Sequence, residues 1–353
     1  MAAEPEPLTA PVDPIDALRR TAYLMERARA GSYRVDAFRN ALALLKAMPP
    51  DELSARLEQG TIRDVSGIGS STGEVIEQAY AGELPTRLAR LQAEAEAPLA
   101  EGGADYWAAL VGDCHSHSTW SDGGSPIDEM VLAAIELGQS WLVLTDHSPR
   151  LTVARGLTAE RLTQQLGVLA AIDRSLDGTF RLLPGIEVDI LDDGSLDQSD
   201  AMLARLDLVT ASVHSKLKMD KAAMTRRMVR AVSDPRVDVL GHCTGRLVTG
   251  GRGKRPQSQF DAEAVFAACA EHGTAVEINS RPERRDPPDE LILLALEHDC
   301  LFAIDSDAHA PGQLEMKRYG CERAARLGVP LDRIVTTWDV DRLLEWSRPG
   351  KGA

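Results

Sequence analysis

The hydrophobic pattern of the chain changes near residue 100 and divides the sequence into two regions. In residues 15–97, apolar positions recur with helical periodicity, most clearly over 15–30 and 33–48. A Gly67-Ile68-Gly69 hairpin separates two of the shorter helices that follow. No strand is predicted before about residue 108, so this first region is expected to be all helical.

Beyond residue 110 the pattern becomes a repeat of short apolar runs and amphipathic helices. The apolar runs fall at 140–148, 180–190, 206–214, 237–243, 274–279 and 300–309. Strands that alternate with helices in this way predict a parallel α/β sheet. Roughly seven such units in this length favour a distorted, closed βα barrel over an open sheet.

The pattern therefore predicts four parts of the chain. These are a disordered, proline-rich tail (1–14), a helical domain (15–97), a small polar linker (98–109) and a βα barrel domain (110–345).

Composition narrows the classes of protein that fit. The net charge of −15 counts against a tight nonspecific nucleic-acid binder, which is usually basic. No apolar run is long enough for a membrane helix, and the acidic N-terminus lacks the features of a signal peptide. The five cysteines are scattered without a CxxC pair, which is typical of reduced thiols, so we expect a cytoplasmic location without membrane association.

Side chains that bind metals collect at the ends of the apolar runs. In His115-Ser-His117 the alternation of a strand aims both rings to one side, roughly 6.5–7 Å apart. In a parallel sheet all such ends meet at one edge. The nine candidate ligands are His115, His117, Asp122, His147, Glu187, His214, His242, Asp307 and His309. Imidazoles mixed with carboxylates favour Zn, Mn or Fe. His272 and His298 fall on predicted helices and are expected to be ordinary surface residues.

Several segments together resemble a known family. "DCHSHSTWSDG", "LTDHS", "GIEVDI", "GHCTGR" and "SDAHAPGQLEMKRYG" are similar to motifs of the PHP (polymerase and histidinol phosphatase) superfamily. More narrowly, they resemble the PHP domain of bacterial family X DNA polymerases. The resemblance implies a distorted seven-stranded βα barrel with three divalent metal ions, which would be Mn, Zn or Fe.

The resemblance also implies three ligand sets. The first ion would be held by His115, His117, Glu187 and Asp307. The second would share Glu187 and add His214 and His242, and the third would take Asp122, His147 and His309. Asp122 stands where many family members have a histidine, which favours the harder ions Mn and Fe.

The helical region resembles the small N-terminal domain of the same polymerases, including its helix-hairpin-helix motif. Backbone amides at Gly67, Ile68, Gly69 and Ser70 would then contact a DNA phosphate, and carbonyls of Arg63, Val65 and Ile68 would bind a monovalent cation. Taken alone, the hairpin is equally consistent with an ordinary helix–helix turn.

Two departures from those polymerases limit what the resemblance implies. The lysine that forms the Schiff base in lyase-active members would fall near Val75, so no such lyase activity is expected. The polymerase palm, with its paired aspartates, should separate the two domains, but only about fifteen residues lie there. The chain is therefore not expected to polymerise DNA.

The predicted chemistry is hydrolysis of a phosphate ester, with Glu187 shared between two cations. Arg246, Arg281 and Arg284 are candidates for neutralising the phosphoryl oxygens, although each also fits a surface salt bridge. Asp146 is predicted to orient a ligand imidazole, and Asn279 to act likewise.

Three functions remain open at this stage. The first is a 3′–5′ exonuclease or related DNA-processing and repair enzyme, and the second is a small-molecule phosphatase such as one acting on histidinol phosphate. The third is a DNA-binding protein without catalysis, although nine polar groups in a concave site without metal would be destabilising. The expected partner is accordingly DNA or a phosphorylated small molecule, and the sequence predicts no protein partner.

Overall fold

A computed structural model describes residues 3, 5–251 and 253–348 of the chain. It divides them into two compact units. Residues 5–98 and 310–313 form one, which we call the helical unit. The other described residues form the second, which we call the sheet unit.

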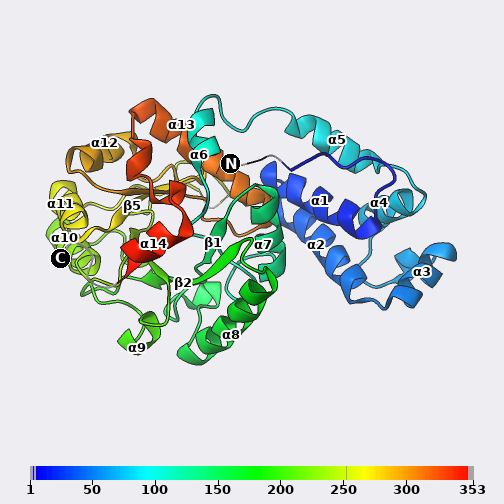
Figure 1. Cartoon of the computed structure of the whole chain (residues 1–353), viewed down its shortest axis with the longest axis horizontal. Helices are drawn as coiled ribbons and strands as arrows, with labels where there is room; N and C mark the ends of the chain where they lie inside the picture. The colour runs from blue at the N-terminus through cyan, green and yellow to red at the C-terminus, as the bar shows by residue number, and fades with distance from the viewer. Residues whose placement is uncertain (1–2, 4, 252, 349–353) are drawn as a thin grey trace. The chain divides into compact units, whose positions relative to one another are not determined.

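Within residues 5–98, the helical unit contains α-helices and one short 3₁₀ helix, as the periodicity predicts (Figure 1). Its elements are α1 (Pro14–Arg27), α2 (Ser32–Ala47), α3 (Pro50–Glu58), η1 (Ile62–Asp64), α4 (Ser70–Tyr80) and α5 (Thr86–Ala95). The Asp13 side chain caps α1 by accepting a hydrogen bond from Ile15 N at 2.8 Å. Leu18, Leu45 and Ile76 are fully buried or nearly so and form part of the core between the helices.

Residues 5–13 of the predicted tail belong to the helical unit. The Gln92 side chain accepts a hydrogen bond from Leu8 N at 2.9 Å and donates one to Leu8 O at 3.1 Å. Val12 is also buried. The segment around Leu8 thus differs from the disordered tail that composition suggested, because a side chain distant in sequence satisfies its backbone. Met1, Ala2 and Glu4 lie outside the described residues.

The sheet unit is built on a curled sheet of parallel strands in sequential order. The strands are β1 (Trp141–Leu144), β2 (Arg181–Asp189), β3 (Leu208–Ser212), β4 (Val239–Leu240), β5 (Ala275–Asn279) and β6 (Phe302–Asp305). Nearly all their residues are buried, as expected when helices cover a parallel sheet.

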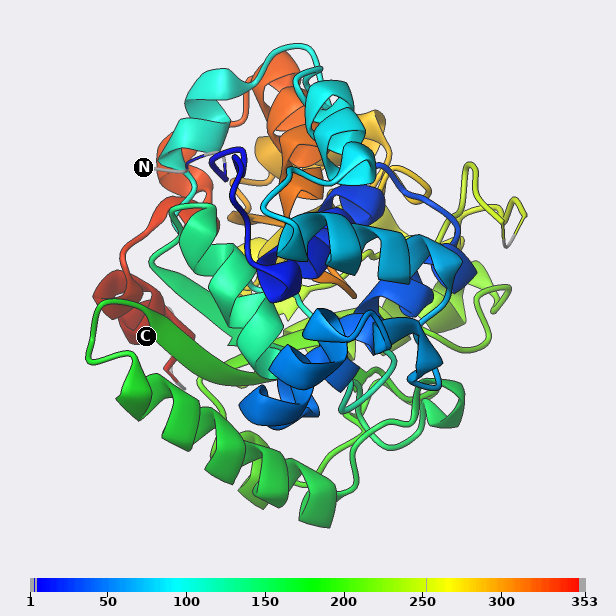
Figure 2. The same ribbon diagram turned by 90° about the vertical axis from the view of Figure 1, so that its right-hand side faces the viewer.

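Helices follow one another around the outside of this sheet. Those of the sheet unit are α6 (Ala104–Ala109), α7 (Ile127–Glu136), α8 (Ala159–Ser175), α9 (Asp200–Leu203), α10 (Lys221–Val232), α11 (Ala262–His272), α12 (Asp289–Glu297), α13 (Lys317–Leu327) and α14 (Val340–Ser347). Helices α10 to α13 are neighbours in turn (Figure 1), and α8 lies along β2 (Figure 2). None of the helices in the described parts of the chain has the length and apolar character needed to cross a membrane.

The predicted count of seven strands is not matched, since the described residues form six. The seventh position, between β1 and β6, is filled by the extended segment 111–117. This segment bonds to β1 through Val143 N and Asp113 O at 3.0 Å, and pairs Ser116 with Ala308 beside β6. Side chains replace other ladder bonds, as where Asp305 Oδ1 accepts from Cys114 N at 2.8 Å. The segment therefore nearly closes the barrel without being a regular strand.

The predicted linker contains a helix that its composition did not reveal. Helix α6 lies within residues 98–109, and its Trp107 is buried. The Tyr106 hydroxyl donates a hydrogen bond to Val329 O at 2.8 Å. These contacts join residues far apart in the sequence, which explains why the local pattern predicted only a connection.

Candidate metal centre

The parallel sheet brings the candidate ligands to one edge. Glu187 lies near the carboxyl end of β2, and His147, His214 and His242 come shortly after β1, β3 and β4. Asp307 and His309 follow β6, while His115 and His117 belong to the segment 111–117. Because parallel strands end on the same side, residues separated by almost two hundred positions meet there.

The Glu187 carboxylate lies at the middle of a ring of imidazoles. The ring nitrogens within 3.6 Å of its two oxygens are Nε2 of His115 (3.2 Å), His117 (3.6 Å), His214 (3.1 Å) and His242 (2.9 Å), and Nδ1 of His147 (2.9 Å). Glu187 itself is buried. One acidic group thus faces five potential metal-binding side chains.

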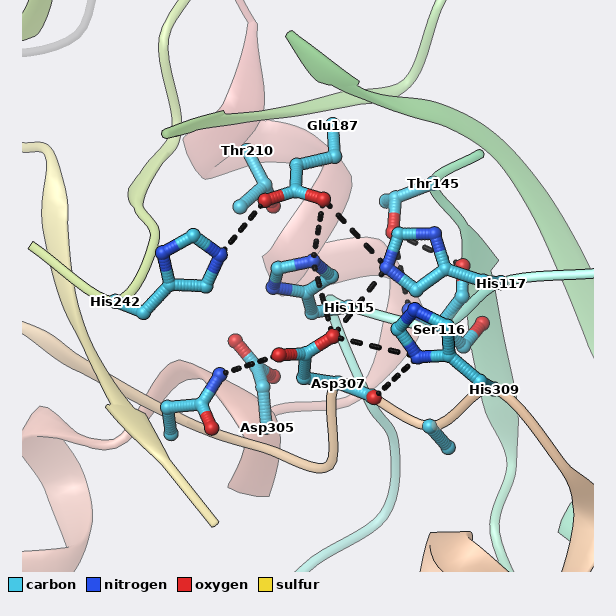
Figure 3. Close-up of polar contacts among 12 residues, drawn as sticks. His115, Ser116, His117, Thr145, Glu187, Thr210, His242, Asp305, Asp307 and His309 are labelled. Atoms are coloured by element: carbon cyan, nitrogen blue, oxygen red, sulfur yellow. Dashed lines mark hydrogen bonds and ion pairs between the residues drawn. The ribbon is translucent and has the colours of Figure 1, made fainter. Parts of the chain in front are cut away.

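Two further carboxylates complete the cluster. Asp307 Oδ1 lies 3.4 Å from Nε2 of His117 (Figure 3), and Asp122 Oδ1 lies 3.4 Å from Nε2 of both His147 and His309. All nine predicted ligands are therefore brought together, in overlapping groups whose ligand atoms lie within 4.8 Å of one another.

Several ligand atoms of the cluster lack the hydrogen bonds that would satisfy them without a metal ion. Both Glu187 oxygens, Nε2 of His115 and both ring nitrogens of His117 are buried without a hydrogen bond, although these atoms lie close together. A buried polar atom left unsatisfied costs roughly 1–3 kcal/mol. Several such atoms aimed at one space therefore indicate a site built for divalent cations, which accept the lone pairs of carboxylates and neutral imidazoles.

The charges of the cluster reflect burial and mutual attraction. Burial lowers the pKa of His115, but the Glu187 carboxylate and other acidic groups outweigh it and raise this pKa well above its usual value. Burial and neighbouring imidazoles lower the pKa of His117 to about 3. Burial raises the pKa of Glu187, yet His147 and the other imidazoles hold it well below its usual value. The low pKa values of Glu187 and His117 favour the ionised carboxylate and the neutral imidazole that metal binding requires, whereas a cation bound at His115 would displace the proton that the raised pKa of this residue favours.

A buried carboxylate that the sequence did not single out positions His115. Glu277 Oε1 lies 2.6 Å from Nδ1 of His115, which leaves Nε2 directed at Glu187. Asn279 Nδ2 donates to Glu277 Oε2 at 3.1 Å and to Asp307 Oδ2 at 3.0 Å. The available signal was the spacing of Glu277 and Asn279, which places both on one face of β5.

Asp189 has a similar relation to His214 and was also missed. Its Oδ1 lies 3.4 Å from His214 Nδ1 and accepts a hydrogen bond from His214 N at 3.1 Å. Asp189 comes two residues after Glu187 on β2, so strand alternation turns both carboxylates to one side.

Asp146 does not have the predicted role of orienting an imidazole. Its carboxylate accepts hydrogen bonds from Ser118 N at 2.8 Å, from the Ser121 hydroxyl and from Gln165 Nε2 at 2.6 Å. Burial raises its pKa. Asp146 thus holds the loop after His117, because alternation turns it away from the neighbouring His147.

The three predicted arginines differ in position. Arg281 and Arg284 line a cavity of about 400 Å³ over the cluster, and Arg284 Nε donates to Asp307 Oδ2 at 3.1 Å. Arg246 does not line it, because its guanidinium instead bonds the backbone carbonyls of Arg284 and Arg285. Arg255, from the basic loop after β4, lines the cavity in its place.

In the helical unit, the predicted DNA-contact residues form the turn that leads into α4. Gly67 has a φ of +99°, and Gly69 caps α4 with its N–H bonded to Thr72 Oγ1 at 2.9 Å. Ile68 is buried, and Ser70 is the first residue of α4. Ser70 therefore lies at an end of a helix where backbone N–H groups point outward.

The carbonyls predicted to bind a monovalent cation lie just before this turn. Arg63 belongs to η1, Val65 follows it, and Val65 O already accepts a hydrogen bond from Ile68 N at 3.0 Å. The Arg63 side chain is paired with Glu77 at 2.6 Å.

Comparison with known proteins finds a family model that matches part of the sheet unit. Residues 113–281 match the family described as PHP domain. The chain is 40% identical over 219 residues to "DNA polymerase/3′–5′ exonuclease PolX" of Bacillus subtilis, which covers 62% of this chain and 37% of that protein. The chain thus spans little more than a third of this relative.

Two further proteins are similar to this chain over most of their own length. A protein of Thermoanaerobacter sp. (strain X514), named as a probable phosphatase, is 28% identical over 253 residues, which is 69% of this chain and 96% of that protein. A solved structure of a Lactococcus lactis histidinol phosphate phosphatase, complexed with zinc, L-histidinol and phosphate, covers 61% of this chain and 94% of its own at 16% identity and a TM-score of 0.42.

Proposed function

Residues 113–281 match the PHP domain, a domain of metal-dependent phosphatases and hydrolases, and on the premise of this match we propose that the protein hydrolyses phosphate esters of DNA. The specific activity that we propose is that of a 3′–5′ exonuclease or a related DNA-processing enzyme. The observation that carries the proposal is the Glu187 carboxylate, surrounded by five imidazoles beneath a cavity with arginines on its wall.

We assign the proposed metals to three overlapping sets of side chains. His115, His117, Glu187 and Asp307 would hold one ion. Glu187, His214 and His242 would hold a second, since both rings lie within 3.1 Å of Glu187 Oε1. Asp122, His147 and His309 would hold a third. When bound, the cations would lower the pKa of a water molecule toward neutrality and neutralise charge on the phosphoryl group.

The chain's own residues would orient the ester over these ions. Arg281 and Arg284 line the cavity, and charge-assisted hydrogen bonds from their guanidinium groups would hold the phosphoryl oxygens. Glu277 would keep the Nε2 atom of His115 directed at the metal site. These groups are largely removed from bulk water, which strengthens each electrostatic interaction.

Two features support DNA as the substrate. The Bacillus relative is named as a polymerase and 3′–5′ exonuclease. In the helical unit, the turn of Gly67 to Gly69 precedes the N-terminus of α4, and such a turn is suited to contact a phosphate of the DNA backbone.

The second candidate is a phosphatase that acts on a small molecule. It is favoured by the cavity of about 400 Å³, a volume suited to one small ligand, and by the relative named as a probable phosphatase. In this case the helical unit would have no part in catalysis.

Turnover of two kinds of substrate distinguishes these functions. The whole chain of residues 1–353 is incubated with Mn, Zn or Fe and a 5′-labelled single-stranded oligonucleotide, and in parallel with histidinol phosphate. Stepwise shortening of the oligonucleotide supports the proposal, while release of phosphate from histidinol phosphate alone supports the second candidate. If neither substrate is turned over with any of these metals, the remaining hypothesis is a DNA-binding protein without catalysis.

A further inference from the structure

A second cavity of about 580 Å³ lies beside the one over the metal centre. Its lining comes from the loops after β3 and β4, namely Lys216, Leu217, Lys218, Met219, Arg255, Pro256, Gln257 and Gln259. We call this cavity the basic groove. Arg255 lines both cavities, so the groove adjoins the candidate catalytic site at this side chain.

Both walls of the groove are tied to the metal centre. One wall begins two residues after His214. The other is fixed by Arg255 Nε, which donates to Gly245 O at 2.6 Å, three residues beyond His242. A ligand in the groove would therefore lie next to an ester held over the metals.

The groove combines positive charge with an apolar surface. Leu217, Met219 and Pro256 provide the apolar part, and two glutamine amides provide donors and acceptors. Lys216 is neutralised by an ion pair with Asp192 at 2.5 Å. Lys218 is exposed and has no hydrogen-bond or ion-pair partner within the described ranges of the chain.

We propose that the basic groove binds the nucleotides next to the scissile phosphate of single-stranded DNA. A base would rest on the apolar surface, and Lys218 and Arg255 would contact backbone phosphates. This inference rests on the proposed function and adds to it a site for polymeric substrate.

The groove accounts for how an acidic protein would hold DNA at this site. The net charge of −15 repels a polyanion at long range, so attraction must come from local cations. The apolar surface has aliphatic rather than aromatic side chains among its lining residues. Binding is therefore expected to be weak, dependent on salt and tolerant of sequence.

The test compares two charge reversals in the metal-loaded chain of residues 1–353. Lys218→Glu places a negative charge in the groove. Lys221→Glu makes the same change in net charge on an exposed residue at the start of α10, outside both cavity linings. The probes are oligothymidylates of increasing length from the dinucleotide, and bis(p-nitrophenyl) phosphate, which is too short to extend into the groove.

For the parent protein we expect kcat/KM to rise with oligonucleotide length. Lys218→Glu should lower kcat/KM for the longer oligonucleotides about fivefold and weaken its dependence on salt, because one exposed phosphate contact is lost. Hydrolysis of bis(p-nitrophenyl) phosphate should not change. Met219→Ser should reduce the gain with length without altering charge.

Equal effects of Lys218→Glu and Lys221→Glu would overturn the inference, since they would indicate only long-range repulsion. The absence of any gain with length would overturn it as well. If bis(p-nitrophenyl) phosphate is hydrolysed in either of these cases, phosphoester hydrolysis stands and only the groove is refuted. If the parent protein hydrolyses no ester, the proposed function itself fails.

Discussion

The edge of the sheet and the helical unit differ in whether their polar side chains have hydrogen-bond partners. At the edge of the sheet, the carboxylate oxygens of Glu187 and the ring nitrogens of His117 are buried close to other ligands without a hydrogen bond. In the helical unit, the buried Glu26 accepts a hydrogen bond from Arg39 at 2.7 Å, and Arg63 is paired with Glu77. Paired charges stabilise a fold by themselves, whereas unpaired buried groups require a further partner. The contrast therefore favours the edge of the sheet as the place of the divalent metal chemistry.

The sharpest test of this contrast is to remove the central charge. Glu187→Gln should lower turnover at least about a thousandfold and reduce the metal content, because the carboxylate faces all the proposed ligand sets. Initial rates and elemental analysis measure both effects. His298→Gln, at the C-terminal cap of α12, is the control and should behave as the parent. A Glu187→Gln protein that keeps its metals and its rate would refute the assignment.

Metal removal should affect the two units unequally. Chelation leaves the buried donors of the sheet unit without a partner. If the free metal concentration is about a thousandfold above Kd, we expect a loss of about 4 kcal/mol, or about 10 °C in Tm. Hydrogen exchange should increase in the segment 111–117 and stay constant in α1. Equal exchange with and without chelator would mean that the cluster is stable without metal.

Glu277 should have a smaller effect, through the position of His115. Glu277→Gln removes the charge that faces His115 Nδ1, so metal affinity should fall about 10–100-fold. Competition with a chelating dye measures the affinity. Saturating metal should restore most of the rate, which a general defect in folding would not allow. Glu290→Gln, on the exposed first turn of α12, is the matched control.

The smallest effect should come from the turn in the helical unit. Gly67→Ala places a Cβ at a φ of +99° and 2.8 Å from Leu44 Cδ1, and should destabilise this unit by about 1–2 kcal/mol. Gly60→Ala is the control, since Gly60 has a φ of +65° but no atom within 4 Å of the added Cβ. Fluorescence anisotropy should show weaker oligonucleotide binding for Gly67→Ala, while hydrolysis of bis(p-nitrophenyl) phosphate is unchanged. Loss of that hydrolysis would show that the two units depend on one another.

The local sequence pattern was sufficient to predict those residues of the candidate site that lie at the ends of strands. His115 and His117 could be paired from their spacing, and Glu187 from its place at the end of an apolar run. Glu277 was overlooked because a single acidic residue within "TAVEIN" offers no local reason to be buried. Its reason is His115, which lies 162 positions away.

The arginines after β4 are a second case in which the local sequence could not identify the residue at the site. Arg246 and Arg255 both follow β4 in loops rich in polar residues, and nothing in their local sequence distinguishes them. Arg246 bonds backbone carbonyls, whereas Arg255 lines the cavity. A long, flexible side chain reaches several partners from one backbone position, so its role depends on which acceptors the fold brings near.

The sequence by itself determined the alternation of strands and helices, the change of hydrophobic pattern near residue 100 and the identity of the nine candidate ligands. Periodicity and side-chain chemistry are properties of neighbouring residues and can be read without the fold. Only the tertiary structure decided that the segment 111–117 takes the seventh position without a regular ladder, that Asp146 holds a loop, and that Glu277 positions His115. Those outcomes depend on contacts between distant residues, which form only when the sheet closes.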